Sequence, residues 1–235
     1  MSRSLTLNAA IKETWPTVFG YLGIGMAFGI VGKGAGLSFG LLLCLSIFVY
    51  AGSAQFIIIS MLLTKSPVLS IMLATFLVNA RMLLMSLTIA PYVKHESMIK
   101  NILLGVFLTD ESFALGMNKL NYTDRKLSFT WLNGANLISY LTWSIATALG
   151  VLVAQFIGDP RTMGIDFAIV SMFIGLLYFQ LIADKSLSFR LQSSLIVITA
   201  ILVYVGMIII PSTWLILSVT LVGCSIGMVI KHVFA

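Results

Sequence analysis

Apolar stretches long enough to cross a lipid bilayer recur along almost the whole chain, separated by short polar or glycine- and proline-containing breaks. A bilayer core about 30 Å thick takes about 20 apolar residues per helical crossing. Hydrophobic residues make up 59% of the 235 residues and charged residues only 9%, against roughly 25% charged in soluble domains. A water-soluble fold could not bury that much apolar surface, so the sequence predicts an all-α, polytopic helical membrane protein.

The apolar stretches predict about eight transmembrane helices, or seven if the long second one is tilted or broken. No loop between them is long enough for a soluble domain, so residues 1–235 are predicted to form a single transmembrane transporter domain. The predicted crossings are residues 15–31, 37–63, 67–90, 101–118, 131–156, 166–183, 191–210 and 213–230.

Two pairs of similar segments indicate a weak internal repeat. GLSF at residues 36–39 resembles GIDF at 164–167, and SIMLATFLV from Ser70 resembles SLIVITAILV from Ser194. Both pairs fall at matching places in two four-helix halves. The halves would then share one orientation, as the repeats of some transporters do.

The basic residues predict how the chain is oriented in the membrane. The positive-inside rule places both termini in the cytoplasm, because this arrangement puts most of the Lys and Arg on that side. The net charge of +6 is scattered over loops, which fits topology and gives no indication of a nucleic-acid partner. The predicted cytoplasmic residues are Arg3, Lys12, Lys65, Lys119, Arg125, Lys126, Lys185, Arg190 and Lys231, and Lys33, Lys94, Lys100 and Arg161 are predicted on the other side.

Three ionisable residues fall inside predicted crossings, where a charge costs about 2.5 to 3.5 kcal/mol and marks a functional site by default. Arg81 precedes Pro91 by about three helical turns, and Asp110 and Glu111 follow Lys100 by a similar length. Arg81 can therefore meet one of the two carboxylates at a single depth. Adjacent helical residues point about 100° apart, so one carboxylate is left to titrate, as a proton-coupled carrier requires. The alternative is an ion pair that only fixes helix packing.

The motif VYAGSAQF at residues 49–56 interrupts the apolar pattern of the second crossing with small and polar residues. Glycine permits a local helix break whose N–H groups can hold an anion, and small residues permit close approach of a ligand or a helix. Gly52, Ser53 and Gln55 are therefore candidate substrate-binding residues. The alternative is a tight helix crossing in which Gln55 bonds the neighbouring helix.

Two further patterns predict how helices pack and which residues line a substrate site. Gly25 and Gly29 in the first crossing form a small-xxx-small pair, which is typical of close helix packing. The fifth crossing carries a polar stripe that should face the bundle interior, and Tyr140 and Trp143 are its candidates for lining a substrate site. The stripe consists of Asn136, Tyr140, Trp143, Thr147 and Gly150.

The sequence argues against an enzyme and predicts neither a metal nor a cofactor. No histidine falls inside a predicted crossing, and the chain has no H-E-x-x-H motif. A channel would need repeated polar rings along a pore, whereas the polar residues here form one cluster. This distribution favours a carrier with a single site.

Five motifs, in this order, resemble the AzlC-type branched-chain amino acid permeases, a family of exporters. They are PTVFGYLGIGMAFG, YAGSAQF, VNARMLL with Asn79, TDESFAL, and GIDFA at the start of the sixth crossing. The family pattern often has histidine or an aromatic residue after the arginine, where this chain has Met82. The resemblance implies export of leucine, valine, isoleucine or close analogues such as methionine across a bacterial cytoplasmic (inner) membrane, with a small AzlD-type membrane subunit as partner.

These observations give a hypothesis for binding a zwitterionic amino acid. The small-residue motif would bind the carboxylate, one acidic residue would take the ammonium group or the coupling proton, and aromatic residues would line the apolar side. The alternative function is a non-catalytic membrane subunit of a hetero-oligomeric channel or transporter, whose charged cluster serves assembly. The candidate substrate-binding residues are Gly52, Ser53, Gln55, Asn79, Arg81, Tyr140 and Trp143, and the candidate coupling residues are Arg81, Asp110 and Glu111.

Overall fold

The computed structural model of the chain describes residues 1–157, 188–210 and 212–234, together with isolated positions between 167 and 181. These residues divide into two compact units, Met1–Leu177 and Tyr178–Ala235. The predicted crossing at 166–183 and the repeat segment at 164–167 lie largely outside the described residues. The single transporter domain and the internal repeat therefore stay predictions.

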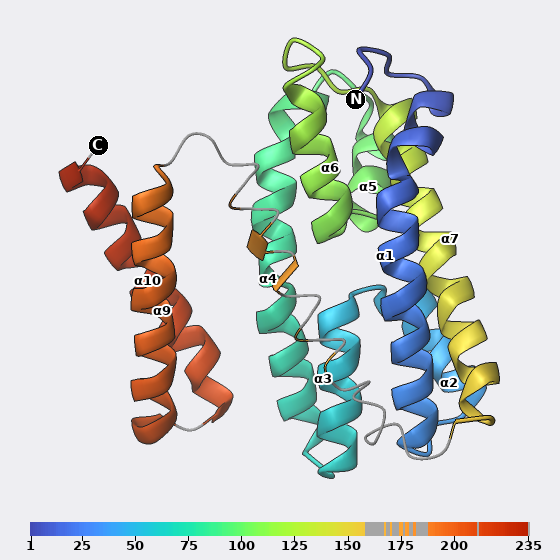
Figure 1. Ribbon diagram of the computed structural model, residues 1–235, viewed down its shortest axis with the longest axis vertical. Coiled ribbons are helices and arrows are strands. Elements are labelled where there is room, and N and C mark those ends of the chain that lie inside the picture. The colour runs from blue at the N-terminus through green and yellow to red at the C-terminus, as the bar shows by residue number, and fades with distance from the viewer. Residues whose placement is uncertain are drawn as a thin grey trace. The chain divides into compact units, whose positions relative to one another are not determined.

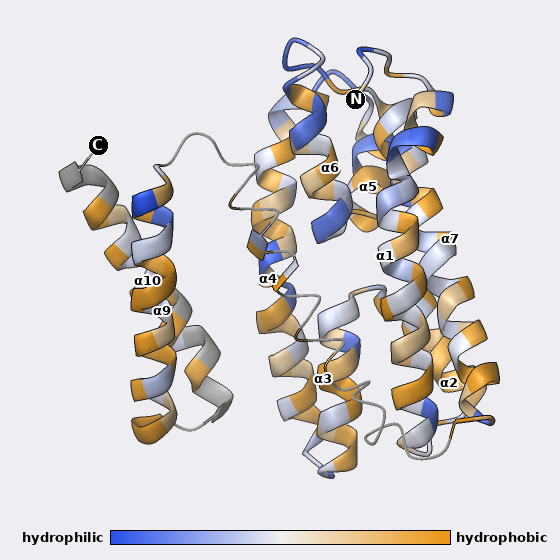
Figure 2. Cartoon of the chain, in the orientation of Figure 1, coloured by the Kyte–Doolittle hydropathy of each residue, from blue (hydrophilic) through white to orange (hydrophobic). Residues whose placement is uncertain are grey.

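The first unit is a helical bundle and the second is a pair of helices (Figure 1). α1, α4, α7 and α9 are each long and apolar enough to cross a membrane, and apolar positions run along their length (Figure 2). A polytopic helical membrane protein is thus confirmed. The elements of the first unit are α1 (Leu7–Gly34), α2 (Phe39–Cys44), the short π-helix η1 (Leu45–Val49), α3 (Gly52–Leu63), α4 (Val68–Val93), α5 (Met98–Val106), α6 (Asp110–Leu120) and α7 (Phe129–Ala154); those of the second are α9 (Phe189–Ile209) and α10 (Ser212–Phe234), which pack on each other.

Two helical hairpins enter the first unit from opposite ends and turn back at its middle (Figure 1). The first hairpin comprises α2, η1 and α3, and the second comprises α5 and α6. α3 begins against Trp143, near the middle of α7, and α6 ends where Lys119 contacts Ser2, before the start of α1. The 12 residues of α3 reach only about 18 Å, which is too short for a bilayer core about 30 Å thick.

The continuous crossings predicted at 37–63 and 101–118 are therefore wrong, because each is a re-entrant hairpin. Hydropathy does not record the direction of the chain, and both arms of each hairpin are apolar. Irregular backbone at membrane depth is tolerated where protein buries it. The correction moves Lys94 and Lys100 to the same end of the unit as the N-terminus, and it moves Lys65 to the opposite end.

Different local chemistry makes the turn in each hairpin. In the first, Tyr50 is left-handed with a φ of 40°, and Ala51 is non-helical with a φ of −141° and a ψ of 89°, so the helix ends and α3 starts afresh. In the second, Thr109 is an N-cap: its side chain accepts from the Ser112 N–H at 3.3 Å, and the Ser112 hydroxyl accepts from the Thr109 N–H at 3.0 Å. This capping box starts α6.

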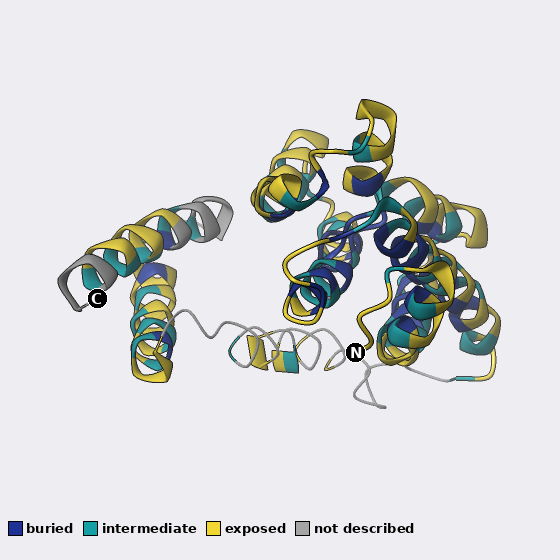
Figure 3. Cartoon of the chain, turned by 90° about the horizontal axis from the view of Figure 1, so that it is seen from above, coloured by how far each residue is buried: buried dark blue, intermediate teal, exposed yellow. Residues whose placement is uncertain are grey.

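α1 and α7 approach each other at glycines, and buried positions within the first unit face one another (Figure 3). A Cβ atom on Gly29 would lie 2.4 Å from the Thr147 carbonyl oxygen, and one on Gly150 would lie 2.2 Å from the Met26 carbonyl oxygen. The close packing predicted for the first crossing is confirmed. Because both obstacles are backbone atoms, a side chain cannot be accommodated by a rotamer change.

Gly150→Ala is expected to destabilise the protein by about 1 to 3 kcal/mol, the usual cost of overpacking. The matched control is Gly20→Ala, because a Cβ at Gly20 in α1 meets no atom of the described residues within 4 Å. Thermal unfolding of the purified proteins in detergent checks this. A Gly150→Ala protein as stable as the Gly20→Ala protein would contradict the close backbone contact.

Candidate functional site

A cavity lies where the tips of the two hairpins meet α1, α4 and α7. The cavity has a volume of about 20 Å³, which is room for roughly one water molecule. An amino acid can therefore enter only if parts of the wall move apart. The cavity is lined by Tyr21, Tyr50, Ala51, Gly52, Ser53, Arg81, Met82, Thr109, Asp110, Glu111 and Trp143.

Arg81 on α4 connects the two hairpin tips. Its Nη2 atom donates to Ser53 Oγ at 2.8 Å and lies 2.9 Å from Asp110 Oδ2. The predicted meeting of Arg81 with one of the two carboxylates is thus confirmed, and Asp110 is its partner. Ser53 is buried and the arginine side chain is 32% exposed, so the guanidinium group bonds the hairpins while it remains open to the cavity.

Glu111 has a different kind of partner. The Tyr21 hydroxyl donates to Glu111 Oε2 at 2.6 Å and also lies 2.8 Å from Thr109 Oγ1. Within the described part of the chain, the carboxylate of Glu111 forms no ion pair within 4.0 Å. The two adjacent acids therefore differ: Asp110 bonds a cation, whereas Glu111 bonds a neutral hydroxyl.

The two helix N-termini at the cavity also differ. α3 starts without a side-chain cap, and Gly52 permits close contact, since a Cβ atom there would lie 2.9 Å from the Trp143 ring. The first N–H groups of an uncapped helix carry partial positive charge and suit an anion. α6 instead starts with its own cap and two acidic residues. One wall of the cavity is therefore rich in hydrogen-bond donors and the facing wall is acidic.

Polar side chains of the stripe on α7 form hydrogen bonds to the two hairpins. The Tyr140 hydroxyl donates to the Ile47 carbonyl at 3.2 Å, and the Thr147 hydroxyl is 2.7 Å from that of Ser46. At the second hairpin, Asn136 Nδ2 donates to the Leu104 carbonyl at 3.2 Å. The stripe faces the interior as predicted, and these hydrogen bonds join it to backbone and side chains of both hairpins.

Gln55 also forms hydrogen bonds that stabilise the helix break in the first hairpin. Its Nε2 donates to the Leu45 carbonyl at 2.7 Å, and its Oε1 accepts from Trp143 Nε1 at 3.0 Å. Gln55, Tyr140 and Asn79 do not line the cavity, although Gln55 bonds Trp143, which does. Gly52, Ser53, Arg81, Asp110, Glu111 and Trp143 do meet there.

Sequence reasoning missed Tyr21, Tyr50 and Thr109 as lining residues. A signal was present for Thr109, because a threonine followed by acidic residues marks a helix start. Tyr21 looked like an ordinary aromatic residue in an apolar run, and Tyr50 belonged to the VYAGSAQF motif but was not named as a candidate. Their position follows only from the meeting of elements that are distant in sequence.

Helices interrupted at mid-depth, with charged groups at the breaks, define the class as a multi-pass membrane protein with an internal polar site. The chain belongs to the AzlC family, whose model, described as "AzlC protein", matches residues 16–157.

Three known proteins are similar to this chain. An "Uncharacterized membrane protein" of Helicobacter pylori (strain J99) is 31% identical over 70% of this chain and 73% of its own. The "Branched-chain amino acid transport protein AzlC" of Bacillus subtilis is 27% identical over 76% of this chain and 69% of its own. The "Inner membrane protein YgaZ" of Escherichia coli is 28% identical over 63% of this chain and 60% of its own. No solved structure gives a significant match to this chain.

Proposed function

We propose that the protein is a secondary transporter that exports branched-chain amino acids, leucine, valine, isoleucine or close analogues, across a bacterial inner membrane. Membership of the AzlC family and the name of the Bacillus subtilis relative support this substrate class. The observation that carries the proposal is the pairing of a donor-rich wall with an acidic wall across one cavity. A zwitterion presents both complementary charges.

Each wall suits one end of an amino acid. The uncapped start of α3, with Ser53 and Arg81, can receive the carboxylate, because helix N-termini and guanidinium groups both favour anions. The facing carboxylates of Asp110 and Glu111 can receive the ammonium group. Met82 and Trp143 offer apolar surface between them. In this proposal, Gln55 and Tyr140 hold the broken hairpin in place and do not touch substrate.

The distribution of charge supports a cytoplasmic N-terminus. Polar positions gather at the end of the first unit that carries the N-terminus (Figure 2). The positive-inside rule favours placing this end in the cytoplasm. This end holds Arg3, Lys12, Lys94, Lys100, Lys119, Arg125 and Lys126, whereas the opposite end holds Lys33 and Lys65.

Efflux of preloaded, labelled leucine and valine from cells tests the proposed function. The chain is expressed with and without a candidate small subunit of the AzlD type, which we propose as its partner. Expression is expected to accelerate efflux, and Asp110→Asn is expected to remove most of the gain at equal membrane abundance, since Arg81 loses its 2.9 Å partner. Efflux that is no faster than in control cells under either pairing would contradict the substrate class.

A further inference from the structure

Glu111 occupies an unusual position for a carboxylate at membrane depth. It is only partly buried and it opens on the cavity, yet its side-chain bond comes from the neutral Tyr21 hydroxyl. An ionised carboxylate that is removed from bulk water without a cation is costly. Glu111 is therefore most stable when it holds either a proton or a cationic ligand.

Tyr50 presents a second incomplete group beside it. Tyr50 is 9% exposed, and its buried hydroxyl forms no hydrogen bond to any residue that the structure describes, although it lines the same cavity as Glu111 and Thr109. The backbone of Tyr50 is left-handed, a conformation that is strained for an aromatic residue and is often found at functional sites. The ring is held by edge-to-face contact with Tyr140 at a centroid distance of 4.9 Å.

We infer that Glu111 and Tyr50 form an exchange site at which a primary ammonium group and a proton bind in turn. The inference rests on the proposed function and specifies how its acidic wall works. The ammonium group donates to the Glu111 carboxylate and to the Tyr50 hydroxyl oxygen. A hydrogen-bond acceptor and an anion next to each other suit this cation, and the unpartnered hydroxyl of Tyr50 then gains a partner.

Asp110 is not the exchanging group, because its carboxylate already lies 2.9 Å from the Arg81 guanidinium. The titratable or charged groups around Glu111 are Asp110 on its own helix, Arg81 on α4, Tyr21 on α1, and Tyr50 at the tip of the first hairpin. Among them, the structure pairs Asp110 with a cation and leaves Glu111 with a hydroxyl.

The proposed exchange is an antiport of one amino acid against one proton. On the outward-facing side, the ammonium group leaves the Glu111 carboxylate and a proton from the medium takes its place. On the inward-facing side, the proton leaves to the cytoplasm and the next ammonium group binds. Each cycle exports a zwitterion of zero net charge and imports one proton, so both the pH gradient and the membrane potential drive export.

The test measures leucine transport in proteoliposomes that contain the full chain, with the small subunit if efflux requires it. Leucine stays zwitterionic between about pH 5.5 and about pH 8, a range in which competition with a proton can be followed. In the wild type, the apparent KM for leucine is expected to rise by up to about tenfold per unit fall in pH once Glu111 is largely protonated. An internal pH dye is expected to show proton movement opposite to leucine movement.

Three variants and one control separate the roles of the residues. Glu111→Gln is expected to raise the KM for leucine about tenfold or more and to abolish both its pH dependence and proton movement. Asp110→Asn is expected to slow transport but to retain the pH dependence. Tyr50→Phe is expected to raise the KM several-fold with the pH dependence intact, whereas Tyr92→Phe, a hydroxyl far from the cavity that contacts Arg125, is expected to change neither.

The outcomes distinguish this inference from the proposed function. Leucine transport whose KM does not change with pH, or a Glu111→Gln protein that still moves protons, would overturn the exchange site and leave the transporter intact. A pH dependence that Asp110→Asn removes and Glu111→Gln keeps would assign the exchange to the other acid. Absence of leucine transport at every pH would overturn the proposed function and the exchange site with it.

Discussion

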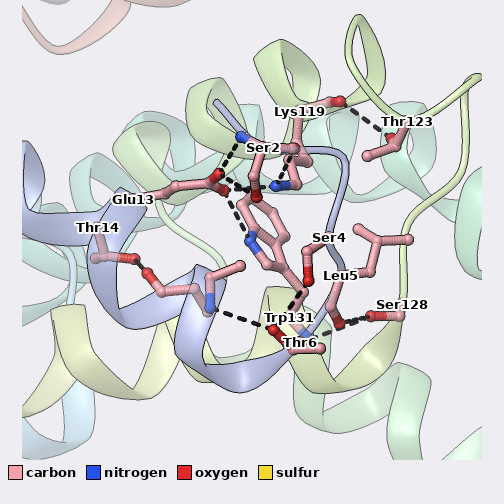
Figure 4. Close-up of polar contacts among 12 residues, drawn as sticks. Ser2, Ser4, Leu5, Thr6, Glu13, Thr14, Lys119, Thr123, Ser128 and Trp131 are labelled. Atoms are coloured by element: carbon pink, nitrogen blue, oxygen red, sulfur yellow. Dashed lines mark hydrogen bonds and ion pairs between the residues drawn. The ribbon is translucent and has the colours of Figure 1, made fainter.

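Replacing Lys119 with methionine is expected to remove most of the folded protein from the membrane. Lys119 is fully buried, and its Nζ atom lies 2.6 Å from Glu13 Oε2 and 2.9 Å from the Ser2 carbonyl oxygen (Figure 4). The same Glu13 oxygen accepts from Trp131 Nε1 at 3.0 Å. Removing one partner of a buried pair leaves an uncompensated charge and costs about 3 to 5 kcal/mol.

The chain offers a matched control for this substitution at the same end of the bundle. Lys100 lies 2.7 Å from Glu96 Oε2, but the lysine side chain is 47% exposed. The bond from Lys100, together with the Phe129 N–H, holds the pKa of Glu96 below its usual value. Solvent screens this pair, so Lys100→Met is expected to leave the stability nearly unchanged.

Membrane abundance and thermal unfolding measure both variants. Glu13→Gln combined with Lys119→Met is expected to recover much of the stability that Lys119→Met loses, because no unpaired charge is left. Equal unfolding temperatures for Lys119→Met and Lys100→Met would show that the buried pair does not hold α6 to α1.

Arg81→Ala is expected to reduce leucine transport by about 100-fold or more, since truncating one partner of a bonded charge pair costs about 2 to 5 kcal/mol. The substitution removes the bonds to Ser53 and Asp110 that connect the two hairpin tips. Arg81→Lys keeps the positive charge but replaces the planar guanidinium group, with its several N–H donors, by a single ammonium group. It is therefore expected to retain only part of the wild-type activity.

The amount of Arg81→Ala protein in the membrane decides between the two functions that the sequence left open. A carrier loses transport while its abundance is kept, because the arginine side chain is 32% exposed and faces a cavity. A subunit whose charged cluster serves assembly loses abundance and its association with the partner. Immunoblotting of membranes beside the efflux assay separates these results.

The sequence predicted the main components of the site but not the path of the chain. Arg81 meets Asp110 because helical rise places them at one depth, and that calculation does not depend on whether the fourth segment crosses the membrane. The predicted direction of α5 was wrong, whereas that of α6 was right, because apolar composition is the same for a crossing and for a hairpin. The cap at Thr109 was the local sign of a new helix start.

Other features could not be predicted because they depend on contacts between distant elements. Gln55 could have bound substrate or a neighbour, and only the folded chain shows both ends of its amide used at the first break. The different environments of Asp110 and Glu111 likewise depend on Tyr21, about ninety residues away in sequence. Adjacent acids on a helix look equivalent until their neighbours are known.

Protection of the cavity by substrate is the most direct test that it binds branched-chain amino acids. Cys44 and Cys224 are first replaced by alanine, and Met82→Cys then places a single thiol in the cavity wall. Leucine, valine and isoleucine are expected to slow its reaction with a water-soluble thiol reagent, with half-maximal protection near the concentration that half-saturates transport. Lys65→Cys, at an exposed loop away from the cavity, should show no protection. If the Met82→Cys protein transports leucine but leucine leaves its labelling rate unchanged, the cavity between the hairpin tips is not the substrate site.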